Sequence, residues 1–248
     1  DPGWVEERLA ESFEYRGGPL GVGEAVSSEV LEYFEGILPA STLQVWRTVG
    51  FDGLAEGRNW ITNPLEWAPA VESWLEGVEL PFPDQRWWCV TRTPMGSMQL
   101  WGEVSGPALA VKSVLGAFSP DGSAQRNMAD PVMRERMGCN RLLIPSEDGG
   151  VCDDVTGRSL VDVGFERFET LAADEVFALV PAYCLSGRME ASMLAVEPAV
   201  AHVAFLGQST QPTMRPDMLA TFGGEIADLL AAQGVVDPAT GKPITFNQ

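Results

Sequence analysis

Few side chains in this sequence of 248 residues have the type and spacing that catalysis requires. His202 is the one histidine, and its neighbours Val200, Val203 and Phe205 predict an apolar helix around it. A histidine with a pKa near neutrality can serve as a general base, but a packed imidazole is the more common arrangement in such a helix. Neither a Ser-His-Asp triad nor a zinc site has support in the sequence. We therefore expect no catalytic residue and no enzyme activity.

Paired carboxylates are the second candidate chemistry. Glu147 and Asp148, then Asp153 and Asp154, lie in a glycine-containing loop at residues 147–157, where oxygen ligands could hold a cation. The spacing departs from the Asp-x-Asp-x-Asp-Gly pattern of calcium loops, and no glutamate follows at the required offset. A solvated turn is favoured, so we expect no bound metal. The glycine-rich segment at residues 16–21 lacks a following Lys-Ser or Lys-Thr, which predicts a turn instead of a phosphate site, and no cofactor is expected.

The charge of the chain indicates which partners it can bind. Sixteen basic and 35 acidic residues give a net charge of −19. Residues 1–84 carry −12, residues 85–142 carry +3 and residues 143–248 carry −10. Because phosphate binding requires lysine and arginine, we expect no direct nucleic-acid binding and no binding to an anionic membrane. A basic protein partner is favoured, although solubility alone would also explain an acidic chain.

The cysteines and tryptophans indicate the cellular compartment and the packing of the core. The four cysteines show no metal-ligand or redox spacing and predict free thiols in a reducing compartment. No apolar run approaches the roughly 20 residues that span a bilayer, and the first residues lack the features of a signal peptide, so we expect the cytoplasm. All eight tryptophans lie between Trp4 and Trp101, mostly beside acidic residues. Core packing is the expected role, with one or two exposed as anchors in a protein interface.

The elements that must position these side chains predict an α+β fold, with N-terminal helices and an antiparallel sheet followed by a mostly helical C-terminal module. Ser41 with Gln44 forms a capping box for a helix that ends at Gly50. Asn63 caps a second helix, with Pro64 at its first position. We expect an apolar stripe on that helix at Leu65, Ala68, Val71 and Leu75.

The remaining expected elements follow from hydrophobic periodicity and turn residues. A hairpin is expected after Gly50, and strands are expected at residues 86–92, 97–104 and 141–145. The expected further helices cover residues 4–15, 28–36, 165–171, 174–180, 195–207 and 217–233.

Composition suggests three segments: a first domain at residues 1–118, a connecting segment at 119–142 and a second domain at 143–248. The connecting segment carries several arginines and few large apolar residues. Met128, Val132, Met133 and Met137 fall at roughly helical spacing, so this segment either links the two domains loosely or packs across both.

Two stretches carry a resemblance to known families. LPASTLQVWRTVGFDGLAEGRNWITNP at residues 38–64 and QRWWCVTRTPMGSMQLWGEVSG at residues 85–106 resemble the GAD-like domain. Residues 165–208 contain a Leu-x-x-Asp-Glu run that leads through an aromatic residue into Val-Pro-Ala. This second stretch resembles the C-terminal domain of type VI secretion immunity proteins. The order of the two domains is also that of the family.

The resemblance implies an immunity protein that binds and neutralises a cognate toxic effector, most often a DNase delivered by a type VI secretion system. Acidic surfaces would then steer a basic toxin and compete with the phosphate backbone for it. The predicted contact residues are Asp153, Asp154, Glu169, Asp174 and Glu175. Two alternatives stay open: an enzyme with an unrecognised small-molecule site, and a general adaptor or regulatory protein.

Overall fold

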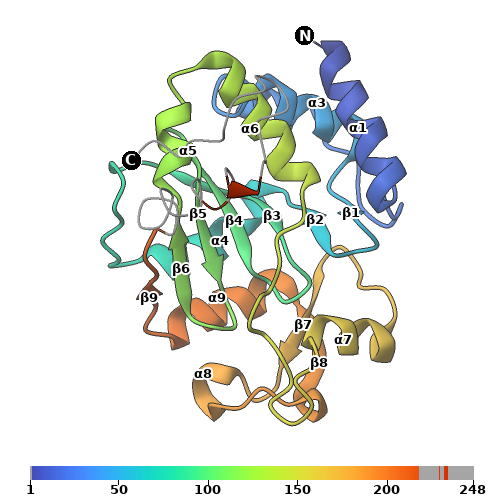
Figure 1. The fold of residues 1–248 in the computed structure, drawn as a ribbon, viewed down its shortest axis with the longest axis vertical. Coiled ribbons are helices and arrows are strands. Elements are labelled where there is room, and N and C mark those ends of the chain that lie inside the picture. The colour runs from blue at the N-terminus through green and yellow to red at the C-terminus, as the bar shows by residue number, and fades with distance from the viewer. Residues whose placement is uncertain (1, 218–228, 230–231, 234–248) are drawn as a thin grey trace.

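The structure is a computed structural model that describes residues 2–217, 229 and 232–233. Its main sheet has the strand order β1-β2-β3-β4-β5-β6-β9, and a second sheet pairs β7 (Glu175–Leu179) with β8 (Leu194–Pro198) (Figure 1). The α+β class predicted from the sequence is confirmed. The strands of the main sheet are β1 (Gly53–Leu54), β2 (Asn59–Ile61), β3 (Trp87–Arg92), β4 (Met98–Gly102), β5 (Gly106–Lys112), β6 (Ala117–Pro120) and β9 (Thr213–Met214).

Neighbouring strands from β1 to β6 are antiparallel, and β9 joins β6 in parallel. The hairpin after Gly50 and the strand pair around residues 93–96 are confirmed. Side chains alternate between the two faces of β3, because successive residues of a strand point in opposite directions. Trp87 and Cys89 belong to one apolar core, whereas Trp88 and Val90 belong to another.

Helices cover both faces of the main sheet. The core that contains Trp88 is closed by the helices of the N-terminal region and by a helix after β6, and the core that contains Cys89 is closed by α4 and α9. The helices are α1 (Pro2–Arg16), α2 (Ser28–Phe34), α3 (Ala40–Val49), α4 (Pro64–Leu75), α5 (Gly122–Asn127), α6 (Pro131–Leu143) and α9 (Ala199–Ser209). The N-terminal helices expected at 4–15 and 28–36 are thus confirmed.

Tryptophans fill much of these cores. Trp46, Trp60, Trp74 and Trp101 are each at most 1% exposed, and Trp4 is the half-buried exception. Core packing is their role, as predicted. The expectation that one or two would be exposed as interface anchors is wrong, because none of the eight is exposed. None of the helices in the described part is long and apolar enough to cross a bilayer.

The caps of two helices differ in how well the sequence predicted them. Asn63 caps α4 as predicted, since its side chain accepts a hydrogen bond from Leu65 N at 3.2 Å. The capping box at Ser41 is wrong. Ser41 lies inside α3, and Glu135 of α6 accepts hydrogen bonds from Ala40 N and Ser41 N at 3.3 and 2.7 Å. A carboxylate brought from a distant helix therefore caps α3.

The apolar stripe predicted on α4 is also partly wrong. Val71 is buried, but Leu65 is 39% exposed and the buried side carries Trp67, Ala70 and Trp74. The face of α4 that packs against the sheet and α9 is the one that carries the indoles of Trp67 and Trp74.

A lobe at residues 144–198 lies below the sheet in Figure 1. It holds α7 (Leu160–Phe168), β7 (Glu175–Leu179), α8 (Tyr183–Ser186), the short 3₁₀ helix η1 (Ala191–Met193) and β8 (Leu194–Pro198). Its core includes Phe177 and Leu194 together with Trp60 and Met95 of the main sheet region. The lobe and the sheet therefore share apolar contacts.

Several predictions in this half need correction. Residues 175–179 form strand β7 and not a helix, because alternate side chains pack into two different cores. The helix expected at 165–171 begins at Leu160, and the one expected at 195–207 is strand β8 followed by α9. The strand expected at 141–145 is the end of α6 and the loop after it. The helix expected at 217–233 lies almost wholly outside the described residues.

The segment predicted as a connection is mostly helical. Cys139, Leu142 and Leu143 of α6 are buried against α3 and the main sheet. Gly138 lies so close to α3 that an added Cβ would stand 2.6 Å from Pro39 Cγ. Residues 131–143 are thus part of the body of the fold.

Candidate functional site

The first pair of predicted contact residues lies in the loop before α7. Asp153 is 4% exposed, and its carboxylate accepts hydrogen bonds from Thr156 N, Thr156 Oγ1 and Ala191 N at 2.9, 2.6 and 2.7 Å. These bonds hold the pKa of Asp153 below its usual range, with the Thr156 hydroxyl as the largest cause. Asp153 therefore holds this loop and η1 together from a buried position. Asp154 is exposed, and its carboxylate accepts from Met189 N at 2.6 Å.

The other three predicted contacts surround the turn between α7 and β7. Glu169 ends α7 with a φ of 62° and is exposed, as is Asp174. Glu175 is half-buried, and its carboxylate accepts from Ala172 N at 2.8 Å. The structure thus leaves Asp154, Glu169 and Asp174 at the surface, while Asp153 and Glu175 hold turns together.

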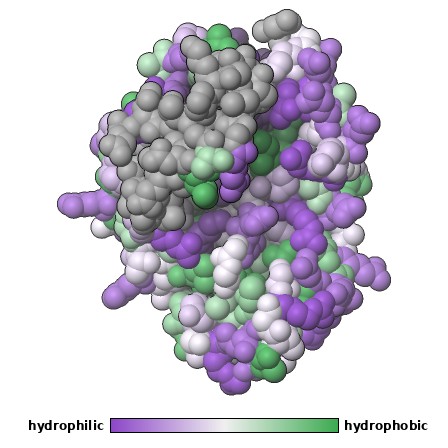
Figure 2. Space-filling model, in the orientation of Figure 1, coloured by the Kyte–Doolittle hydropathy of each residue, from purple (hydrophilic) through white to green (hydrophobic). Residues whose placement is uncertain are grey.

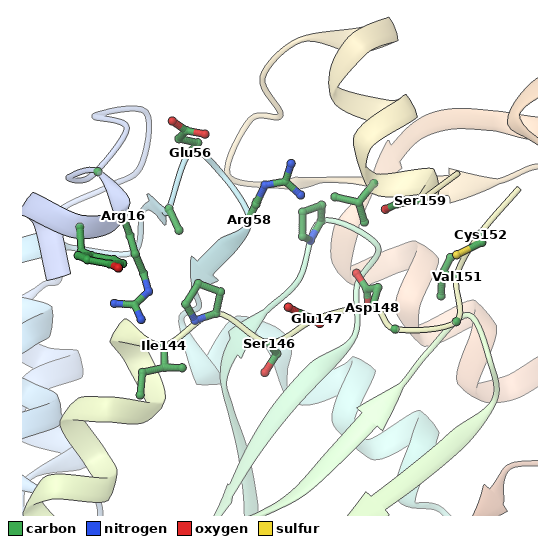
Figure 3. Close-up of a pocket in the computed structure, with 18 of the residues that line it drawn as sticks. Arg16, Glu56, Arg58, Ile144, Ser146, Glu147, Asp148, Val151, Cys152 and Ser159 are labelled. Atoms are coloured by element: carbon green, nitrogen blue, oxygen red, sulfur yellow. The ribbon is translucent and has the colours of Figure 1, made fainter. Parts of the chain in front are cut away.

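A cleft of about 900 Å³ opens between the end of α1, the β1–β2 turn and the loop before α7 (Figure 3). Arg16 and Arg58 line one side, whereas Asp148 and Cys152 line the other. Arg58 forms an ion pair with Asp162 at 2.7 Å. The cleft is lined by Glu147 and Asp148, one of the carboxylate pairs that the sequence singled out.

Asp148 is the unusual group in this cleft. Both carboxylate oxygens are buried, and neither has a hydrogen-bond partner among the described residues. Burial is the main cause that raises the pKa of Asp148. Ser97, Thr93 and Lys112 oppose this shift in part but do not reach hydrogen-bond geometry with the carboxylate. The solvated turn predicted from the sequence is therefore wrong for Asp148.

The cleft does not assemble a recognisable reaction centre from the residues described. Ser159 and Cys152 line it, but the one histidine, His202, lies on α9 and does not line it. Burial lowers the pKa of His202, and Glu197 opposes that shift. Among the described residues, no three histidine, cysteine, aspartate or glutamate side chains gather as a metal ligand set. What the cleft offers is a buried acid, Asp148, opposite two exposed arginines, Arg16 and Arg58.

A buried arginine was missed by the sequence analysis. Arg92 at the end of β3 is 1% exposed, and its guanidinium stacks on Trp60 at 4.6 Å and donates to Ala173 O at 2.9 Å. Burial lowers its pKa to about 9. Arg92 therefore ties the main sheet to the α7–β7 turn. The position of Arg92 in a strand does not indicate this role, because the carbonyl that accepts its hydrogen bond lies about eighty residues later in the chain.

Comparison with known proteins supports part of the resemblance. Residues 8–115 match the family model of the GAD-like domain. The fold is similar to the crystal structure of Atu4351 from Agrobacterium tumefaciens, with a TM-score of 0.65 and 15% sequence identity. This superposition covers 82% of this chain and 90% of that chain. At such identity the likeness concerns the fold alone. Among curated proteins, no sequence matches the chain.

Proposed function

We propose that this chain is an immunity protein. The proposal starts from the match of residues 8–115 to the GAD-like domain. It binds a cognate toxic effector in the cytoplasm and neutralises it by covering or distorting its active site. The resemblance of residues 165–208 to type VI immunity domains supplies the class of effector, a secreted DNase. The chain itself acts as an inhibitor and not as an enzyme.

The observation that carries this proposal is a set of exposed glutamates, of which one forms an ion pair within the described residues. Every glutamate from Glu6 to Glu79 is exposed. Within the described residues, the ion pair of Glu11 with Arg8 is the one that involves this set. Figure 2 shows hydrophilic side chains along the edge of the molecule that α1 forms. Unpaired surface charge of one sign attracts a partner of the other sign and repels nucleic acid.

This charge fits a DNase as partner. A nuclease presents lysine and arginine where it grips the phosphate backbone, and these are the groups that an acidic inhibitor meets first. Attraction over several ångströms raises the association rate, while contacts of apolar side chains then hold the complex.

The rival proposal with a specific observation behind it is an enzyme that uses the 900 Å³ cleft and Asp148. A concave site with a perturbed acid is a common feature of active sites. Such an enzyme would turn over a substrate without any partner, and the Asp148→Asn variant would abolish that turnover.

A protection assay tests the proposal. Cells that produce the cognate DNase effector should keep intact chromosomal DNA when they also produce this chain. A matched strain that produces a variant with several α1 and α2 glutamates changed to lysine should lose much of this protection. DNA that is degraded equally with and without the unaltered chain would overturn the proposal.

A further inference from the structure

A groove of about 700 Å³ lies where the main sheet, the α7–β7 turn and α9 meet. It is distinct from the cleft around Asp148, with which it shares no lining residue. Residues from the loop at 22–24, the first turns of α4, the loop at 172–174 and the first turns of α9 form its walls. The groove is thus built from segments that are far apart in the sequence.

The interior of this groove is apolar. Phe51, Ile61 and Trp67 form buried parts of its wall, at 6%, 2% and 5% exposure. The apolar lining continues to the surface at Val22, which is 51% exposed, and at the exposed Ala201 of α9. Small alanine side chains along α9 leave room for the side chains of a partner.

The rim carries charge of one sign. Glu24, Glu66 and Asp174 come from three separate segments, and all three are exposed. None of them takes part in an ion pair within the described residues, and the groove lining, all of which is described, contains no lysine or arginine. Arg92 attracts Asp174 from behind the wall, but it is buried and cannot reach a ligand in the groove. The rim therefore keeps a net negative charge.

We propose that this groove receives a segment of the effector in which lysine or arginine flanks an apolar side chain. The apolar side chain enters the groove, and the cations pair with Glu24, Glu66 and Asp174. This proposal rests on the proposed function and assigns it a contact surface. An apolar centre inside a charged rim is the usual arrangement of a protein interface. A second copy of this acidic chain would bring like charges to the rim, which disfavours it as the occupant.

Two charge-reversal variants with the same change in net charge test the groove. The groove variant combines Glu24→Lys with Asp174→Lys, and the control variant combines Glu7→Lys with Glu14→Lys on α1. The probe is the purified cognate DNase effector, made inactive by substitution at its active site. We expect the groove variant to weaken binding about a hundredfold, mainly through faster dissociation, and the control to slow association several-fold. Equal losses in both variants would overturn the proposal.

A photo-crosslinking measurement covers the case in which a variant alters folding. Benzoylphenylalanine at the exposed Ala201 should crosslink to the effector in the otherwise unaltered chain, whereas the same group at the exposed Ala10 on α1 should not. A complex that crosslinks at Ala10 and not at Ala201 would overturn the groove while leaving the proposed function intact. Crosslinks between two copies of this chain at Ala201 would also overturn it. Failure of the unaltered chain to bind the effector would overturn the proposed function itself.

Discussion

The indole Nε1 of Trp74 donates a hydrogen bond to the carbonyl oxygen of Val203 at 2.9 Å, across 129 residues of chain. This bond joins α4, within the GAD-like match, to α9 near the end of the described chain. Both residues are buried in one core that also contains Val176 and Leu206. The two halves of the sequence therefore fold against each other and share their apolar interior.

Gly207 tests this contact between the halves. An added Cβ at Gly207 would stand 2.9 Å from the Ser73 carbonyl carbon, which is backbone and cannot move aside cheaply. We expect Gly207→Ala to lower stability by about 1–3 kcal/mol and the melting temperature by about 2–4 °C for each kcal/mol. Gly18→Ala is the matched control, since nothing lies within 4 Å of its added Cβ. Equal melting temperatures for the two variants would show that α4 and α9 are not packed closely.

Asp148 should destabilise the fold when it is ionised. Burial raises its pKa, so the free energy of unfolding falls as pH rises above the unfolded-state value of about 3.9. We expect Asp148→Asn to raise the melting temperature at pH 8 and to have a smaller effect at pH 4. Glu147→Gln, at an exposed neighbour, is the control. A variant that melts lower than the parent at both pH values would show that attraction to Lys112 outweighs burial.

Asp153 should affect the pH dependence of stability in the opposite direction to Asp148. Its pKa is lowered by hydrogen bonds, so its contribution is present above the unfolded-state value of about 3.9 and is lost as pH falls through the folded-state value. Thermal melts should show Asp153→Asn below the parent at pH 7, with the difference shrinking in acid. The control variant Glu169→Gln, at an exposed position, should change neither the melting temperature at pH 7 nor its dependence on pH. An Asp153→Asn variant that melted like the parent but weakened effector binding would show that Asp153 acts in binding and not in holding the turn.

The elements that the sequence predicted well are those with local signals. Asn63 and Pro64 mark the start of α4, and Gly50 marks the end of α3, because the cap and its helix lie within a few residues. Where a residue far away in the sequence determines the local structure, the prediction from the sequence was wrong. Glu135 replaces Ser41 as the cap of α3 across about ninety residues, and residues 175–179 form a strand that pairs with β8 and packs into two cores.

The candidate site was predictable in its charge and not in its geometry. Net charge and the exposed glutamates follow from composition, since glutamate on an amphipathic helix faces water. The burial of Asp148 depends on the distant β3–β4 turn, and the groove around Trp67 depends on α9 and the turn at 172–174. Such sites form between segments, so neither a motif nor a spacing reveals them.

The exposed acids should make association with the effector depend on salt. Raising the ionic strength from about 0.1 M to about 1 M shortens the Debye length from about 10 Å to about 3 Å. We expect the association rate, measured by stopped-flow fluorescence, to fall at least about tenfold, with a smaller change in dissociation. The control is a pair of uncharged binding partners whose association rate does not depend on salt, measured under the same conditions. An association rate that ignores salt would assign the acidic surface to solubility alone.

Titration of the purified effector with this chain, with plasmid cleavage as the readout, decides whether the chain is an inhibitor. We expect cleavage to fall in proportion to the added chain and to stop when one complex has formed for each effector, and we expect the chain alone to cleave nothing. Cleavage that continues at full rate with excess chain present, or cleavage by the chain itself, would show that the chain is not an inhibitor of this effector.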